Sequence, residues 1–227
     1  MEDKYTVSEY RTSLMGFAML WIMLYHIGID ISYLNPLTRS GYLGVDIFIF
    51  LSSYGLYYSM KNNKTSIINF YKKRLIRILP TYYIVLILMF IISGVSAGSL
   101  DFNKLLQDVS FIGFFFPCLK WSYFLWYIPA IIFLYFLFPL LFRWLSYIKR
   151  PDIIGLVFIL LVVSNFIITK YIFVNGYEKF SLLLLIPRIF VFILGLIWAD
   201  LENKNYQKVW NNKIICILLF LPVGGIK

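Results

Sequence analysis

Residues 16–58 read GFAMLWIMLYHIGIDISYLNPLTRSGYLGVDIFIFLSSYGLYY, two long apolar runs separated by a short polar loop. Each run approaches the roughly 20 residues that an α-helix needs to cross the hydrocarbon core of a bilayer. The stretch therefore predicts two membrane-spanning helices joined by a loop. It also contains His26, the only histidine of the protein, and Asp46. Ionisable side chains at membrane depth are costly and rare, so both residues are candidate functional groups.

The rest of the chain has the same apolar character. Of its 227 residues, 61% are hydrophobic and 20% are aromatic, whereas a soluble domain is about half apolar. This composition predicts an all-α, polytopic transmembrane helical bundle, a single membrane-embedded domain over residues 1–227 whose first partner is the lipid bilayer. The two cysteines, Cys118 and Cys216, fit neither a metal-site spacing nor a disulfide framework, so we expect no metal.

The apolar runs predict six full spans, at about residues 13–30, 42–59, 75–95, 123–145, 153–173 and 180–199. The loop at 96–122 contains VSFIGFFFPCL, which is too short to cross a bilayer and predicts an interfacial or re-entrant segment. A last apolar run begins near Ile214 and stops at Lys227. We interpret it as a partial seventh span, and we expect further C-terminal spans to be missing from this chain.

The basic residues predict how the spans are oriented. With the N-terminus in the cytoplasm, fourteen Lys and Arg residues of the loops and span ends lie inside and five lie outside. The positive-inside rule favours this orientation, which makes the 60–74 loop cytoplasmic and the 96–122 loop external. The net charge of +10 is therefore explained by loops of a multi-pass cell-membrane protein, and we expect no nucleic-acid partner.

Three ionisable residues are predicted to lie at a similar depth. At 1.5 Å per residue, His26 lies roughly 20 Å from the inner end of the first span, and Asp46 lies about one turn inside the outer end of the second. Arg188, beside the helix-opening Pro187, lies roughly 12 Å from the outer end of the sixth span. We therefore expect one polar cavity in the outer half of the membrane. Two alternatives remain open: His26 caps a helix end or hydrogen-bonds a neighbouring helix, and Arg188 is a paired structural charge.

Several motifs carry a resemblance to a known family. They are the histidine of the first span, GVDIFIFLSS at 44–53, FYKKRLIRILPTYY at 70–83, LWYIPAIIFLY at 125–135 and IPRIFVFILG at 186–195. Each motif is weak alone, but together, in this order and spacing, they resemble acyltransferase family 3, the bacterial integral-membrane O-acyltransferases. The resemblance covers essentially the whole chain. Members of the family have more spans than this chain, which agrees with missing C-terminal spans.

The chain departs from the family pattern at two positions. The family usually has an arginine eleven positions before the histidine, on nearly the same helix face, and this position is Met15 here. Arg11 lies one turn earlier and about 60° off that line. The usual Ser-Gly pair after the apolar core of the second span is Ser52–Ser53. The first departure affects the expected catalytic arrangement, and the second affects only close helix packing.

The resemblance implies an acyltransferase that moves an acyl group, expected to be acetyl, from cytoplasmic acyl-CoA to a hydroxyl of a cell-envelope or extracellular glycan or lipid-linked saccharide. His26 would be the general base, because imidazole ordinarily titrates near neutral pH. Asp46 would orient the imidazole. Arg188 would stabilise the oxyanion or hold the acceptor.

The basic stretch before the third span suggests the donor site. Arg74 and Arg77 share a helix face, and paired guanidinium groups suit the phosphate oxygens of acyl-CoA. The alternative is that these charges only orient the protein and attract anionic lipids. A contrasting function is a transporter or flippase for a lipid-linked sugar, which the polar His/Asp/Arg set would also suit. The Arg-x-x-Arg loop and the lone histidine favour the enzyme.

Overall fold

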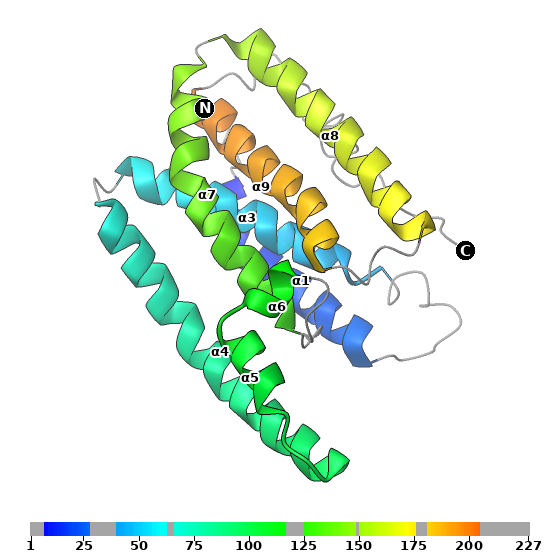
Figure 1. The fold of residues 1–227 in the computed structure, drawn as a ribbon. Coiled ribbons are helices and arrows are strands. Elements are labelled where there is room, and N and C mark those ends of the chain that lie inside the picture. Colours follow the sequence, from blue (N-terminus) through cyan, green and yellow to red (C-terminus); the bar gives the residue numbers. More distant parts are fainter. Residues whose placement is uncertain are drawn as a thin grey trace. The chain divides into compact units, whose positions relative to one another are not determined.

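The computed structural model describes residues 7–27, 40–62, 66–116, 125–148, 150–175 and 181–204. Within these ranges the chain forms eight helices and no strand: α1 (Val7–Ile27), α3 (Leu43–Asn62), α4 (Ile67–Ala97), α5 (Phe102–Val109), α6 (Ile112–Phe115), α7 (Tyr127–Tyr147), α8 (Pro151–Val174) and α9 (Ser181–Asn203) (Figure 1). The prediction of an all-helical protein is confirmed.

Four of the helices are long and apolar enough to cross a membrane, at Ile67–Ala97, Tyr127–Tyr147, Ile153–Ile172 and Leu183–Asn203. The predicted count of six full spans is not confirmed, because the helices at the first two predicted spans, α1 and α3, also carry charged and hydroxyl-bearing side chains. The predicted partial seventh span lies outside the described residues.

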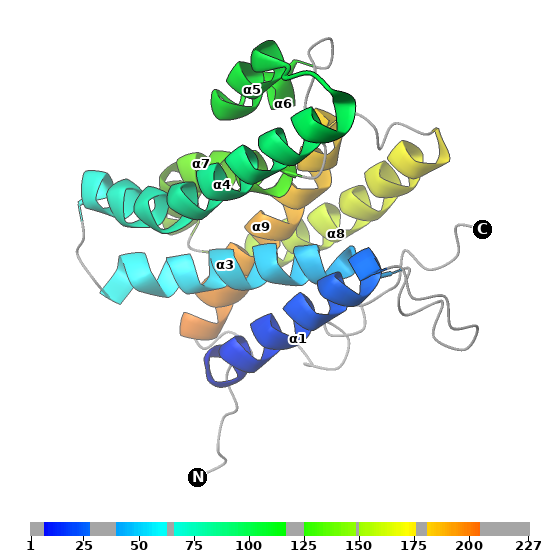
Figure 2. The ribbon, with the colours of Figure 1, turned by 90° about the horizontal axis from the view of Figure 1, so that it is seen from below.

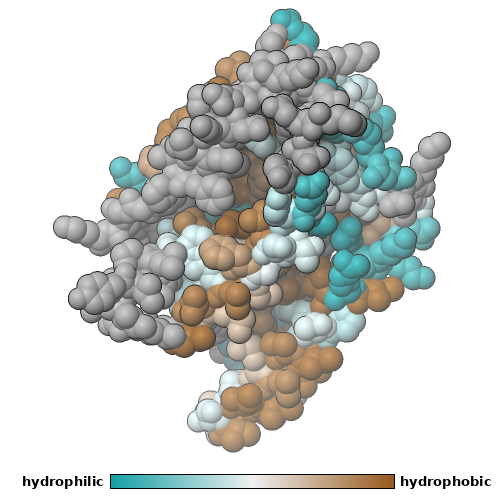
Figure 3. Space-filling model, turned by 180° about the vertical axis from the view of Figure 1, so that it is seen from behind, coloured by the Kyte–Doolittle hydropathy of each residue, from teal (hydrophilic) through white to brown (hydrophobic). Residues whose placement is uncertain are grey.

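Large apolar side chains cover much of the surface, as a lipid environment requires. On α4, nine aliphatic residues are half or more exposed: Ile67, Ile68, Ile76, Ile84, Ile87, Leu88, Ile91, Ile92 and Val95. Figure 3 shows broad hydrophobic areas on one face of the molecule. Exposing this much apolar area to water is unfavourable by about 25 cal/mol per Å². Together with the four apolar helices, these surfaces indicate a membrane protein.

The chain divides into two compact units, which are described separately. The first comprises residues 1–63, 142–170 and 188–227, and the second comprises residues 64–141 and 171–187. Helices α7, α8 and α9 each contribute residues to both units. The expected single domain over the whole chain stays a prediction.

In the second unit, α4 and α7 pack antiparallel through aromatic residues. The Phe70 and Phe138 rings stack with centroids 5.1 Å apart. Toward the other end of α4, buried Tyr82 packs in a cluster with Leu125 of the turn before α7. Local caps define the ends of α4: the Ser66 side chain accepts a hydrogen bond from an amide of the first turn, and Gly98 ends the helix at φ 67°, a left-handed conformation that suits glycine.

Helices α5 and α6 fold back along α4, as Figures 1 and 2 both show. The Phe102 ring contacts Phe90, with centroids 5.4 Å apart, and the Tyr82 hydroxyl donates to the backbone carbonyl of buried Asp108 at 2.7 Å. The described part of the predicted interfacial or re-entrant segment is therefore the end of α5 and the short α6. Its position in a bilayer stays a prediction.

In the first unit, α1 and α3 form a closely packed antiparallel pair (Figure 2). Gly41 lies against the Tyr25 side chain, and a Cβ atom on Gly44 would come within 2.7 Å of the Ala18 carbonyl. Glycine is needed at these points because the backbones approach too closely for a side chain. The pairing of the two helices agrees with the loop-connected pair that residues 16–58 predict.

Helix α9 packs against a different side of α3. Its Gly195 lies directly against the Ser53 side chain and the Phe50 carbonyl. At 100° per residue, Gly44 faces α1, whereas Ser53 points about 180° away from it. Helix α3 therefore lies between α1 and α9.

Candidate functional site

An ion pair joins two of the predicted catalytic residues. Asp46 lies in the first turn of α3, and its Oδ1 atom is 3.4 Å from Nε of Arg188 on α9. The two atoms form an ion pair without the geometry of a hydrogen bond. The side chain of Arg188 is 5% exposed and that of Asp46 is 26% exposed, so one end of the pair remains accessible. A buried guanidinium requires such a partner, because an isolated buried charge is very unfavourable.

His26 lies in the last turn of α1, where its side chain is exposed. Its Nδ1 atom is 2.8 Å from the carbonyl oxygen of Ile22, and its ring contacts Tyr25 edge-on. Because Ile22 packs against Gly44, the imidazole folds back toward the level of Gly44, two residues before Asp46. The common depth of these residues in a membrane stays a prediction.

The structure does not bring His26 and Asp46 into contact. Helix α1 packs against the side of α3 that carries Gly44, whereas Asp46 is turned about 200° from Gly44 and faces Arg188. A hydrogen bond through which Asp46 would orient the imidazole is therefore absent among the described residues. The carboxylate orients the guanidinium instead.

Tyr42 interacts both with the Asp46–Arg188 pair and with Tyr25, the neighbour of His26, and it was not predicted as a site residue. It interacts electrostatically with Asp46, Arg188 and Tyr25, and Tyr25 contacts His26. The available signal was its spacing, because residues four apart in a helix share one face. Tyr42 precedes Asp46 by four positions.

Arg11, the residue nearest to the missing family arginine, enters the contact between α1 and α3. Its Nε donates to the Leu51 carbonyl at 3.1 Å, and its guanidinium lies against Gly55. The absence of a side chain at Gly55 makes room for it. Arg11 is about 22 Å along the helix axis from His26, so it lies at the opposite end of α1 from the histidine.

The two arginines predicted to bind the donor lie near the start of α4, in the second unit. The guanidinium of Arg74 lies 5.9 Å from the centroid of the Phe70 ring, a cation–π contact. Arg77 is exposed one turn later, next to exposed Lys72 and Lys73 on the preceding turn. The pair therefore lies in a cationic region, as predicted, and its role in binding stays a prediction.

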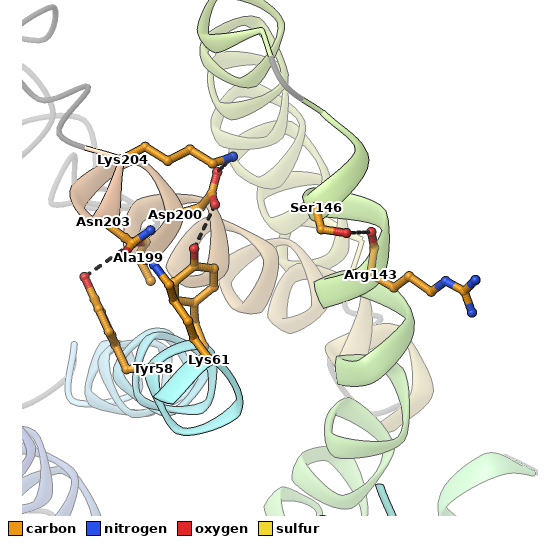
Figure 4. Close-up of polar contacts among 9 residues, drawn as sticks. Tyr58, Lys61, Arg143, Ser146, Ala199, Asp200, Asn203 and Lys204 are labelled. Atoms are coloured by element: carbon orange, nitrogen blue, oxygen red, sulfur yellow. Dashed lines mark hydrogen bonds and ion pairs between the residues drawn. The ribbon is translucent and has the colours of Figure 1, made fainter. Parts of the chain in front are cut away.

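A second polar cluster, which we call the tyrosine–carboxylate seam, joins the C-terminal halves of α3 and α9. The Tyr54 hydroxyl donates to Glu202 at 3.0 Å, and the Tyr57 hydroxyl donates to Asp200 at 2.9 Å. Lys204 lies 2.7 Å from the other oxygen of Asp200. Lys61 of α3 contacts Asn203. Figure 4 shows Tyr58 and Lys61 of α3 facing these α9 residues, whereas Arg143 points away.

The seam was not predicted from the sequence, because the sixth span was expected to end at residue 199, just before the two carboxylates. The signal was again spacing: Tyr54, Tyr57 and Tyr58 recur at helical intervals.

Within the described ranges, no group of three His, Cys, Asp or Glu residues is arranged to hold a metal ion.

Comparison with known proteins now identifies the family. Residues 14–226 match the family model described as "Acyltransferase domain", that of acyltransferase family 3. The chain belongs to this acyltransferase family. The matched range includes all five predicted site residues and begins after Arg11. The resemblance that the sequence motifs predicted is confirmed.

This chain is also similar to a viral protein. It is 28% identical over 210 residues to a protein of Acidianus two-tailed virus named "Putative acetyltransferase ORF330". The alignment covers 92% of this chain and 62% of the viral protein, so the chain spans less than two thirds of that relative's length. No solved structure matches the chain.

Proposed function

We propose that this acyltransferase-family chain transfers an acyl group, most simply acetyl, from acyl-CoA to a hydroxyl of a cell-envelope or extracellular glycan. The observation that carries the proposal is the buried Arg188 paired with the partly accessible Asp46 at the start of α3. A buried arginine whose carboxylate partner is partly accessible places positive charge in a low-dielectric site, where it is suited to stabilise a developing negative charge.

The reaction needs a base and a stabilised oxyanion. The acceptor hydroxyl loses its proton to the base while its oxygen attacks the thioester carbonyl, which forms a C–O bond and a tetrahedral oxyanion. Arg188 is the proposed donor to that oxyanion. Collapse of the intermediate breaks the C–S bond, and the departing thiolate takes a proton. Asp46 is the proposed positioning residue for the guanidinium, which the ion pair supports better than the imidazole-orienting role expected from the family.

His26 is the proposed base. If its Nδ1–H donates to the Ile22 carbonyl, as the 2.8 Å distance permits, the lone pair of Nε2 is available to take a proton. A backbone carbonyl then orients the ring, the task that a carboxylate performs in other sites. The exposure of His26 lets an acceptor reach it.

The donor is proposed to bind through Arg74 and Arg77, on the cytoplasmic side in an N-terminus-inside, multi-pass orientation. The cationic region at the start of α4 supports this, since four basic side chains suit the phosphates of acyl-CoA. The lipid bilayer and a glycan or lipid-linked saccharide are the proposed partners.

The test is transfer of radiolabelled acetyl from acetyl-CoA to saturating lipid-linked saccharide by membranes that contain the chain. We expect label in the saccharide fraction, and none with the double variant His26→Gln, Arg188→Gln. Unlabelled saccharide that nevertheless crosses the membrane would overturn the proposal in favour of a transporter or flippase. Label that appears equally with the double variant would overturn the assigned residues.

A further inference from the structure

Helices α3 and α9 run parallel in a single register. An offset of 142 residues joins Asp46 to Arg188 near one end, Ser53 to Gly195 in the middle and Lys61 to Asn203 at the other end. The Tyr57–Asp200 bond has an offset of 143, and the Tyr54 side chain reaches further along α9, to Glu202, at an offset of 148. The offset of 142 to 143 in the other contacts means that residues at corresponding heights on the two parallel helices face each other.

Apolar packing alone would not hold this register. The two helices are far apart in the chain, so no short loop ties their ends together. In a membrane, a slide of one turn, about 5.4 Å, exchanges one set of apolar contacts for another of similar value, because lipid tails are as apolar as leucine. The register must therefore come from contacts that a slide destroys.

The tyrosine–carboxylate seam has this property. Asp200 is 3% exposed and Tyr54 is 1% exposed, so the seam is shielded from water. A one-turn slide would separate each hydroxyl from its carboxylate and leave buried Asp200 and half-buried Glu202 without those donors, which is costly. Gly195 adds a steric contact, because its Cβ-free backbone lies against Ser53. The Tyr58 hydroxyl interacts with that of Tyr54 on its own helix, and its bond to α9, to the Ala199 carbonyl at 3.4 Å, is not specific, since every turn of α9 offers a carbonyl.

We infer that Tyr54 and Tyr57 are positioning residues whose bonds to Glu202 and Asp200 hold α9 in register on α3 and so place Arg188 opposite Asp46. Asp200 and Arg188 are twelve residues apart on one helix, roughly 18 Å along its axis. A helix transmits an axial displacement along its length, so a slide at the seam moves Arg188 by the same amount. The idea that this register serves catalysis rests on the proposed function. The register itself is inferred from the contacts between α3 and α9 and does not depend on that function.

The test measures the register directly in membranes that contain the whole chain. Spin labels are placed at Asn62→Cys, at the end of α3, and Ile189→Cys on α9, in a Cys118→Ser, Cys216→Ser background. The labelled positions differ by roughly 22 Å in height along the parallel pair. We expect one narrow distance in this background and in the matched control Tyr58→Phe, which also loses a hydroxyl.

In the Tyr54→Phe, Tyr57→Phe double variant, we expect the distance to shift by about 5 Å or to split into two populations. Each single variant should show a smaller second population, and these singles decide the matter if the double variant does not accumulate. An unchanged narrow distance in the variants, even with lower thermal stability, would overturn the inference. Failure of the acetyl-transfer assay would leave these distances unchanged, so the two proposals fail separately.

Discussion

The two ends of the contact between α3 and α9 hold charged side chains in opposite ways. At the seam, both oxygens of Asp200 are partnered, one by Tyr57 and one by Lys204. At the other end, the Asp46–Arg188 pair is held at 3.4 Å without hydrogen-bond geometry, and Asp46 is a quarter exposed. The Asp200 carboxylate has both of its oxygens partnered within the protein, whereas the Asp46 carboxylate remains partly exposed.

This difference separates structural from functional polar groups within one helix pair. A buried carboxylate with a partner on both oxygens, such as Asp200, gains nothing from a ligand. A partly exposed carboxylate such as Asp46, in an ion pair without hydrogen-bond geometry, leaves room for a ligand or a transition state to approach the pair. Substitutions at the accessible end should therefore act directly on the reaction, whereas substitutions at the seam should lower stability and act on the reaction only through the position of Arg188.

The largest effect is expected at the accessible end. Arg188→Gln removes the proposed oxyanion donor and should lower acetyl transfer by about 10²- to 10³-fold, the usual effect of losing such a donor. Acetyl transfer to the saccharide fraction measures it, with the amount of folded protein determined in parallel. Asp46→Asn should cost less, because it misplaces the guanidinium without removing it. If acetyl transfer falls only in proportion to the amount of folded protein, the Asp46–Arg188 pair has a structural role, like the seam.

His26→Gln should lower the same rate by about 10²-fold, because glutamine preserves hydrogen bonding but cannot act as a base near neutral pH. Expression and thermal stability should change little, because the His26 side chain is exposed. Tyr25→Phe is a matched control on the neighbouring position. A near-normal rate in His26→Gln would assign the histidine to helix contacts alone.

The seam should respond in stability rather than in substrate affinity. Tyr57→Phe removes one donor from buried Asp200 and should lower the free energy of unfolding by about 1 kcal/mol. Thermal unfolding in detergent, compared with Tyr58→Phe, measures the difference. Equal stabilities for the two variants would mean that the Tyr57 bond to the Asp200 carboxylate stabilises the protein no more than the Tyr58 bond to the Ala199 carbonyl.

The smallest effect is expected at the start of α4. Changing Arg74 and Arg77 together to Lys keeps the charge but loses bidentate phosphate geometry, so the apparent KM for acetyl-CoA should rise by roughly two- to tenfold. Initial rates at varied acetyl-CoA give the value, and membrane insertion should be normal. If KM is unchanged, these charges serve orientation of the chain in the membrane.

Much of the fold was predictable because apolar length and composition are properties of a local stretch. The runs around Gly16–Tyr58 predicted helices, and the motifs at 44–53 and 70–83 predicted the family. The exact number of spans was less predictable, since α1 and α3 mix apolar with charged and hydroxyl side chains. The seam was missed for the same reason: Asp200 and Glu202 look like the polar end of a span until their partners on α3 are known.

The sequence by itself determined the height of each site residue, because every residue adds 1.5 Å to a helix, and it placed Asp46 and Arg188 at matching levels. Only the tertiary structure decided which residues face each other. Rotation of a helix about its own axis is set by its neighbours: the glycines of α3 admit α1 on one side, and Ser53 meets Gly195 of α9 on another. That rotation turns Asp46 toward Arg188 and away from His26.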